Sequence, residues 1–221
     1  KKVISASYSV FDRFYSLGGA SVNYTYCGIQ KKDGGLMSSE EVAKRRVASI
    51  DIVVKHNRSY KLYQYMKMLL PEDLVNPLFK EEDCGFREDV YINNHNKYSS
   101  GQSMLMNLII EIVAHIRQNS LILIDEPEVH LHPKGITTFI GILNRICKEF
   151  SSCCILATHS AVIIQELLSR NVIVMDRQDD GSPVVRPMRV ESLGENLTTI
   201  TEDVFGRGEV SPYYKSVVKK I

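Results

Sequence analysis

The sequence predicts an α/β fold, in which a mostly parallel sheet is flanked by helices and joined to a small helical subdomain. From Ser99 onward, short apolar runs alternate with helical patterns, as is typical of a parallel sheet with crossover helices. Residues 36–97 carry mainly helical patterns instead. We therefore expect three segments: strands that continue an upstream core (1–35), the helical subdomain (36–97), and one half of an α/β domain (98–221).

The first segment contains two stretches that favour strands, residues 3–10 and residues 22–29. The KKDGG stretch at 31–35 then indicates a turn. An aromatic segment follows the first of these strands. The segment thus supplies strands but no complete domain of its own.

The second segment begins at a helix-start signal. Ser38 is a typical helix cap, because two acidic residues follow in the first turn. The helical pattern runs to about His56. A second pattern covers residues 60–70 and is stopped by Pro71.

The third segment alternates helices with apolar strands. Two of its strands, residues 121–124 and 153–157, are apolar enough to be covered on both faces of a sheet. The other expected elements are a helix with apolar positions from Leu105 to Ile116, a helix opened by Pro133, a helix from Ala161 to Leu168, a third strand from Val172 to Met175, and a hairpin strand from Val184 to Val190.

Composition limits the classes of protein that fit. Lys plus Arg is 27 and Asp plus Glu is 26, so the net charge of +1 gives no strong bulk attraction to nucleic acid or to an anionic membrane. These totals leave a local basic patch open. The five cysteines include no CxxC pair and fit a reducing cytoplasm. No apolar stretch approaches the ~18 residues of a membrane span, so we expect a soluble, cytoplasmic protein.

Two adjacent acids, Asp125 and Glu126, end the LILI strand. The carboxyl ends of strands are where open α/β sheets bind ligands. Magnesium prefers one or two carboxylates together with phosphate oxygens and water, so Asp125 is the candidate metal ligand. Glu126 is then placed to orient or deprotonate an attacking water. The simpler alternative is a strand that ends in a polar loop.

His159 follows the next apolar strand, with one helix between it and the two acids. If these strands are parallel neighbours, the imidazole and the carboxylates emerge at the same edge of the sheet. A histidine there can bond a γ-phosphate or steady the water-activating carboxylate. A lone histidine at a strand end is otherwise an ordinary polar cap.

The YSSGQ stretch at 98–102 precedes a long helix with an apolar face. Ser99, Ser100, Gly101 and Gln102 allow close backbone approach, and a helix N-terminus offers unpaired N–H groups to an anion. An ordinary Ser-capped helix is the alternative. His130 and His132 with Glu128 also suggest a metal site, but an extended loop after the acids explains them without a further ligand.

The phosphate-cradling loop GxxxxGKS/T is absent from the 221 residues. The chain opens without an initiator, and its first methionine is Met37. We therefore expect an internal piece of a longer protein, with the nucleotide cradle upstream of Lys1.

Together these motifs resemble those of ABC-type ATPases. YSSGQ resembles the LSGGQ signature, LILIDEPE the Walker B strand, EVHLHP the dimer-contacting loop, and ATHS the switch histidine. The DEPE–VHLHP form is similar to AAA/ABC ATPases of the RecF, SMC and OLD type. Within that group, VISASYSVFDRF, YTYCGI and ENLTTITEDVFG resemble the PtuA family of Septu antiphage systems, including those attached to retrons.

The resemblance implies an ATP- and Mg²⁺-dependent ATPase that dimerises head-to-tail with a second copy of itself. Residues 99–102 would touch nucleotide in trans, Asp125 would serve Mg²⁺, and Glu126 and His159 would serve hydrolysis. The PtuA family also implies an HNH nuclease partner of the PtuB type, with a reverse transcriptase and its RNA–DNA product in retron versions.

The resemblance has departures and leaves alternatives. Ser100 replaces a signature glycine, the Walker A loop is missing, and the Q-loop position near residues 9–14 offers no glutamine. A RecF- or OLD-like DNA-repair or nuclease ATPase is the closest alternative, although no TOPRIM acidic cluster is found in these residues. A non-hydrolysing ATP-bound scaffold and a transporter motor are the others.

Overall fold

A computed structural model describes residues 2–7, 23–31, 33–129, 131–178 and 180–206. Contacts divide the chain into two compact units, Lys1–Thr158 and His159–Ile221. The three segments expected from the sequence stay a prediction. The strands are β1 (Lys2–Ser7), β2 (Asn23–Tyr26), β3 (Leu121–Asp125), β4 (Cys153–Ala157), β5 (Ile173–Arg177) and β6 (Pro183–Pro187). The helices are α1 (Ser39–Lys55), α2 (Ser59–Leu69), α3 (Glu72–Val75), α4 (Glu88–Asn93), α5 (Ser100–His115), α6 (Pro133–Glu149), α7 (Ala161–Gln165) and α8 (Leu197–Phe205).

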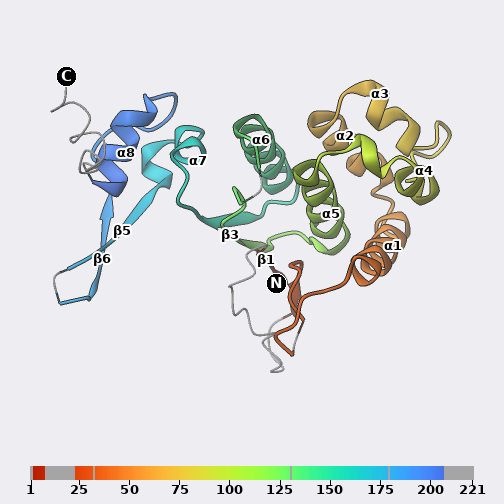
Figure 1. Ribbon diagram of the computed structural model, residues 1–221, viewed down its shortest axis with the longest axis horizontal. Coiled ribbons are helices and arrows are strands. Elements are labelled where there is room, and N and C mark those ends of the chain that lie inside the picture. The colour runs from red at the N-terminus through yellow and green to blue at the C-terminus, as the bar shows by residue number, and fades with distance from the viewer. Residues whose placement is uncertain (1, 8–22, 32, 130, 179, 207–221) are drawn as a thin grey trace, which may run out of the picture. The chain divides into compact units, whose positions relative to one another are not determined.

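The first unit is built on a four-stranded sheet in the order β2-β1-β3-β4. Each neighbouring pair is parallel, and Val3, Leu121 and Cys153 stand side by side in register. The helix α5 contacts β1, the helix α6 contacts β4, and the two helices lie side by side (Figure 1). This arrangement confirms the predicted α/β class, a mostly parallel sheet flanked by helices.

One face of this sheet forms the floor of the main core. Ile4 and Ala6 of β1 and Ile122 and Ile124 of β3 are at most 3% exposed. They pack in one cluster with the apolar side chains of α5, most of which are fully buried. Burying an aliphatic side chain contributes about 1.5–3 kcal/mol, so this face stabilises the unit strongly.

The opposite face corrects two expectations. Residues 121–124 and 153–157 were expected to be covered on both faces, but burial alternates along both strands. Ile155 is 61% exposed, and the neighbouring Cys153 is exposed rather than buried. The physical reason is that β4 is the edge strand of the described sheet, and no described element of the first unit covers this face of it.

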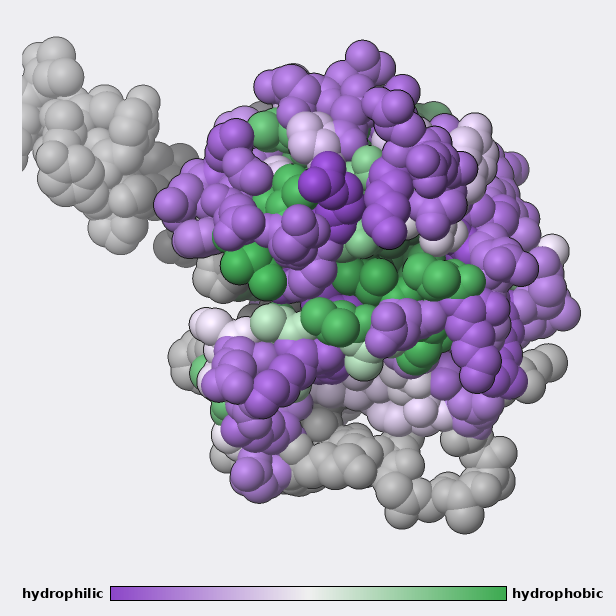
Figure 2. All heavy atoms as spheres, turned by 90° about the vertical axis from the view of Figure 1, so that its right-hand side faces the viewer, coloured by the Kyte–Doolittle hydropathy of each residue, from purple (hydrophilic) through white to green (hydrophobic). Residues whose placement is uncertain are grey.

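The helical region, α1 to α4, packs against α5. The predicted start of α1 is confirmed, because Ser38 and Glu41 form a reciprocal capping box. Arg46 of α1 is 6% exposed; its Nε donates to Glu88 at 2.9 Å and its guanidinium lies 4.3 Å from the centre of the Tyr91 ring. These contacts tie α1 to α4. Figure 2 shows an apolar band between hydrophilic areas on this side of the molecule.

A buried ionic network joins α1, α5 and the end of β2. Arg45 Nε lies 2.7 Å from Glu111 Oε1, and Glu111 is only 3% exposed. The Cys27 thiol donates to the same carboxylate, and Arg45 Nη1 donates to the Gly28 carbonyl oxygen at 2.6 Å. Burial raises the pKa of Glu111, although Arg45 and Cys27 lower it in part.

The second unit contains β5, β6, α7 and α8. The expected hairpin is confirmed: β5 and β6 pair antiparallel as their own two-stranded sheet. The third strand, expected from Val172 to Met175, is present as β5 and belongs to this two-stranded sheet. The helix expected from Ala161 to Leu168 ends at Gln165, and a short 3-10 turn follows at Ser169–Asn171.

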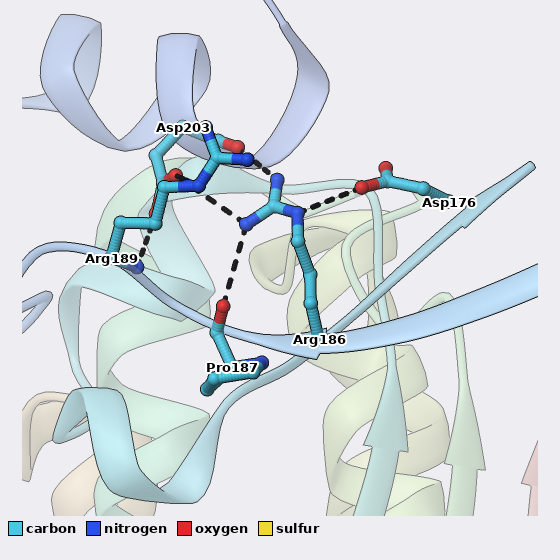
Figure 3. Close-up of polar contacts among 5 residues, drawn as sticks. All are labelled: Asp176, Arg186, Pro187, Arg189 and Asp203. Atoms are coloured by element: carbon cyan, nitrogen blue, oxygen red, sulfur yellow. Dashed lines mark hydrogen bonds and ion pairs between the residues drawn. The ribbon is translucent and has the colours of Figure 1, made fainter.

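Arg186 is the polar centre of the second unit (Figure 3). Its Nε donates to Asp176 Oδ2 on the partner strand at 2.8 Å, and its Nη2 donates to the Asp203 carbonyl oxygen on α8. The Asp203 carboxylate in turn accepts from the Arg189 backbone N–H at 2.9 Å. Ion pairs and hydrogen bonds of Arg186 thus connect the hairpin to α8. They lie beside a small apolar cluster of Ile164, Val174, Met188 and Ile200.

Within the described part of the chain, no helix combines the length and apolar character that crossing a membrane requires.

Candidate functional site

The carboxyl ends of three strands meet at one edge of the parallel sheet. Asp125, the last residue of β3, stands in register between Ser7 of β1 and Ala157 of β4. Ser7 is fully buried, and Asp125 is half-buried. The Asp125 carboxylate therefore lies where ligands bind in open α/β sheets.

Glu126 has an unusual backbone conformation. Its φ is 43°, in the left-handed region, and its N–H donates to the Ala157 carbonyl oxygen at 3.0 Å. For a residue other than glycine this conformation costs roughly 1–2 kcal/mol. Among the described non-glycine residues with positive φ, Glu126 is the charged one; the others are Asn57, Cys84, Asn119 and Ser151. The following Pro127 does not signal this conformation, because a proline favours an extended residue before it rather than a left-handed one.

A hydrogen bond that sequence reasoning missed joins the loops after β3 and β4. Thr158 Oγ1 donates to Glu128 Oε1 at 2.7 Å. The loop after Glu126 is also closed by its own backbone, because the Val129 N–H donates to the Glu126 carbonyl oxygen at 3.2 Å. The second glutamate of DEPE thus positions the strand ends, a role that its spacing alone does not reveal.

The histidine pair after the acids is only partly described. His132 is the N-cap of α6, and its Nδ1 accepts from the Lys134 N–H at 3.4 Å. His130 lies outside the described residues. The confirmed start of α6, with Pro133 in its first turn, gives His132 a structural role.

The YSSGQ stretch forms the start of α5. The Ser99 side chain accepts from the Gln102 N–H at 3.1 Å, and Gln102 Oε1 accepts from the Ser99 N–H at 2.9 Å. Ser100 is exposed on the first turn, and Gly101 is buried. The local structure is therefore a Ser-capped helix, which was the structural alternative to an anion site. Contact of residues 99–102 with a nucleotide stays a prediction.

His159 is two positions past the end of β4 and is the first residue of the second unit. It is exposed, and its ring centre lies 6.4 Å from that of Phe205 on α8. Its role beside Glu126 stays a prediction.

The donor set at the sheet edge fits a magnesium–triphosphate ligand. Magnesium takes oxygen ligands and keeps several waters, and the half-buried Asp125 carboxylate offers such a ligand without a dedicated protein cage. Glu126 adds a second carboxylate on a backbone that is fixed by β4. Two fixed acids at such an edge can hold a hydrated cation and orient a water molecule.

The comparisons with known proteins agree with this chemistry. The model of the AAA ATPase domain family matches residues 30–164, more than half of the 221-residue chain. Protein ea59 of Escherichia phage lambda is 33% identical over 133 residues, which cover 58% of this chain and 25% of that protein.

Two further relatives carry the description putative ABC transporter ATP-binding protein. The one from Bacillus thuringiensis subsp. konkukian (strain 97-27) is 32% identical over 118 residues, or 52% of this chain and 21% of that protein. The one from Bacillus anthracis is 34% identical over 119 residues, with the same shares. The chain therefore spans about a quarter or less of the length of these relatives. The matched segment contains β3, the Asp125–Glu126 edge and β4, and on this evidence the chain belongs to the AAA ATPase domain family.

Proposed function

We propose that this chain supplies the signature and Walker B part of an ATP-hydrolysing head, which dimerises on ATP with a second copy of itself. The observation that carries the proposal is the Asp125–Glu126 pair at the carboxyl end of the central strand β3, with Glu126 in the left-handed conformation. Strained residues concentrate at functional sites, and here the strain falls on the residue that the chemistry needs.

Each group at this edge has a distinct task in the proposal. Asp125 holds Mg²⁺ directly or through water, and the cation neutralises charge on the phosphate oxygens. Glu126 accepts a hydrogen bond from the attacking water and takes its proton. His159 bonds the γ-phosphate or steadies Glu126. Residues 99–102 contact the nucleotide held by the partner head, through the N-terminus of α5.

For the whole protein we propose a PtuA-like role in antiphage defence, in which ATP controls an associated HNH nuclease of the PtuB type. A reverse transcriptase and its RNA–DNA product are the further partners of a retron version. The support is the likeness of three flanking stretches, VISASYSVFDRF, YTYCGI and ENLTTITEDVFG, to that family. A cytoplasmic location is part of the same proposal.

The test is the Glu126→Gln substitution in the full-length protein. Glutamine keeps the size and loses the proton acceptor, so hydrolysis should fall by about 10²–10⁴-fold while ATP is still bound. Steady-state phosphate release and equilibrium binding of labelled ATP measure the two quantities. Turnover equal to that of the wild type would reject the role assigned to Glu126. A wild-type protein that binds ATP without turnover would favour the scaffold alternative.

The descriptions of the Bacillus relatives favour a second candidate, a transporter motor. That function requires a membrane subunit. Purification of the full-length protein with its natural partners separates the two: recovery with a nuclease supports the defence proposal, and recovery with a membrane protein supports the motor.

A further inference from the structure

A basic cavity lies at the end of the sheet opposite Asp125. It has a volume of about 240 Å³, and its charged lining is Lys2, Lys55, His56, Arg58, His115 and Arg117. Among the described residues, no aspartate or glutamate lines it. Because Leu121 begins the strand that Asp125 ends, the two ends are separated by roughly 13 Å of β-strand.

The cavity is assembled from the ends of several elements of the first unit. Lys2 begins β1, Lys55 ends α1, Arg58 precedes α2, and Arg117 follows the end of α5. Lys2 is 8% exposed, and its Nζ donates to Asn23 Oδ1 at 2.8 Å, so this cation is fixed in place. Lys55 and Arg117 are exposed at the mouth.

The cations of the lining have no acidic partner in the described residues. None of the six forms an ion pair there. Arg58 Nη1 donates to the Val113 and Ala114 carbonyl oxygens at 2.7 and 3.3 Å, which leaves its Nε and Nη2 without a described hydrogen-bond acceptor. Cations that are gathered at one place without acidic partners repel one another.

Helix dipoles explain part of this charge, but not all of it. The C-termini of α1 and α5 both reach the cavity, and each carries a partial charge of about −0.5. The N-terminus of α2, with Arg58 at its N-cap position, also lies at the cavity and adds about +0.5. The three termini together therefore offset only about half of one permanent cation among Lys2, Lys55, Arg58 and Arg117. An excess of more than about three positive charges is left before either histidine is counted.

The pKa values report the same repulsion. Burial and then the charges of Lys2, Arg45, His56 and Arg58 lower the pKa of His115. Burial and Arg117 lower the pKa of both Lys2 and Arg58. A bound anion would remove this penalty.

We propose that this basic cavity binds a phosphate group. Basic side chains from four different parts of the first unit line one small volume, which suits a compact multivalent anion better than a single carboxylate. The volume is below the roughly 300–1,000 Å³ typical of sites for drug-sized ligands, so the phosphate enters without the rest of a nucleotide inside the cavity. Its source is either a small phosphate compound or the backbone of a nucleic acid at the open mouth.

The experiment compares two double variants of the full-length protein with equal change in net charge. Lys55→Glu/Arg117→Glu reverses the exposed cations of the cavity. Lys80→Glu/Arg87→Glu reverses two exposed cations of the same unit that do not line it. All titrations are made with ADP and Mg²⁺ saturating the nucleotide site, so pyrophosphate cannot bind there. Circular dichroism melting checks that both variants fold.

Two probes distinguish the sources of phosphate. Pyrophosphate is titrated by calorimetry, and a labelled single-stranded DNA oligonucleotide by fluorescence anisotropy at several salt concentrations. We expect the cavity variant to lose at least tenfold in affinity for pyrophosphate, with the control within twofold of wild type. If the source is nucleic acid, the DNA affinity falls equally, and the slope against log salt decreases by about 0.7–0.9 for each lost contact.

Unchanged DNA binding together with lost pyrophosphate binding assigns the site to a small phosphate compound. Equal affinities of the cavity variant and the control variant for both probes would overturn the proposal. None of these outcomes depends on whether Glu126 supports hydrolysis, so the two proposals fail separately.

Discussion

The two ends of the parallel sheet carry opposite charge. At the carboxyl end, β3 finishes in Asp125 and Glu126 beside the end of β4. At the amino end, Lys2 begins β1 and Arg117 precedes β3, and the charged residues of the cavity lining are all basic. The formal net charge of the chain is only +1, so the total conceals both features. Charge on this fold is organised along the strand direction, and each end must be interpreted by itself.

The direction of the helices gives a physical reason for part of this contrast. The helix α6 begins after β3 and ends before β4, so it runs opposite to the parallel strands. The N-terminus of α6, with partial positive charge, therefore faces the acidic end, and the C-termini of α1 and α5, with partial negative charge, reach the basic cavity, where α2 begins. Helix dipoles thus offset part of the side-chain charge at each end of the sheet. At the basic cavity most of the positive charge is left.

The largest effect, on ATP turnover, is expected when glycine replaces a residue with positive φ at each end of the sheet. Glu126 at the carboxyl end and Ser151, just before the amino end of β4, have φ of 43° and 46°. Glycine at either position should raise the free energy of unfolding by up to about 1 kcal/mol, because it tolerates positive φ. Only Glu126→Gly should also reduce ATP turnover, by about 10²–10⁴-fold.

Urea denaturation and phosphate release by the full-length variants measure both quantities. Similar turnover in the two glycine variants would remove the functional distinction between the ends. A loss of stability in Glu126→Gly would show instead that its carboxylate stabilises the fold.

The next largest effect tests the ionic network between the two ends. Glu111→Ala removes the buried carboxylate that pairs with the half-buried Arg45 guanidinium, and breaking such a pair costs up to about 3–5 kcal/mol. Urea denaturation should show this loss. The matched control is Glu40→Ala, whose pair with Lys44 is exposed and should contribute under about 0.5 kcal/mol. Equal losses in the two variants would contradict the assigned burial.

The same carboxylate predicts a dependence of stability on pH. Burial raises the pKa of Glu111 in the folded state above its usual value of about 4.5, so between these two values the folded state binds more protons than the unfolded state. The contribution of Glu111 is therefore complete below about pH 4.5 and is lost as pH rises through the folded pKa, at up to about 1.4 kcal/mol per pH unit. The Glu111→Gln variant should lack this component in denaturation series across pH. A wild-type and variant profile of identical slope would refute the raised pKa.

The smallest effect separates capping from nucleotide contact. Ser38 and Ser99 form capping boxes of the same kind, at the starts of α1 and α5. Alanine at either position should cost about 1 kcal/mol of stability. Only Ser99→Ala should also lower ATP turnover in the full-length protein, because α1 has no predicted contact with nucleotide. If both variants lose turnover in proportion to their loss of stability, the YSSGQ stretch acts only as a helix cap.

The sequence by itself determined the elements and the order of the motifs. Ser38, Ser99 and Pro133 each mark a helix start that the fold contains, because caps act on the nearest turn of backbone. The apolar run from Leu121 to Ile124 likewise fixed β3 and placed Asp125 at its end. These are local properties, and periodicity along the chain is enough to report them.

Only the tertiary structure decided which segments meet. Residues as distant in sequence as Lys2, Arg58 and Arg117 form one cavity, and Glu111 meets Arg45 and Cys27 in the core. The exposed face of β4 was also beyond the sequence pattern, whereas the β5–β6 hairpin was expected from it. The physical reason is that burial and pairing depend on what the rest of the chain brings alongside a segment, whereas propensity depends only on its neighbours in sequence.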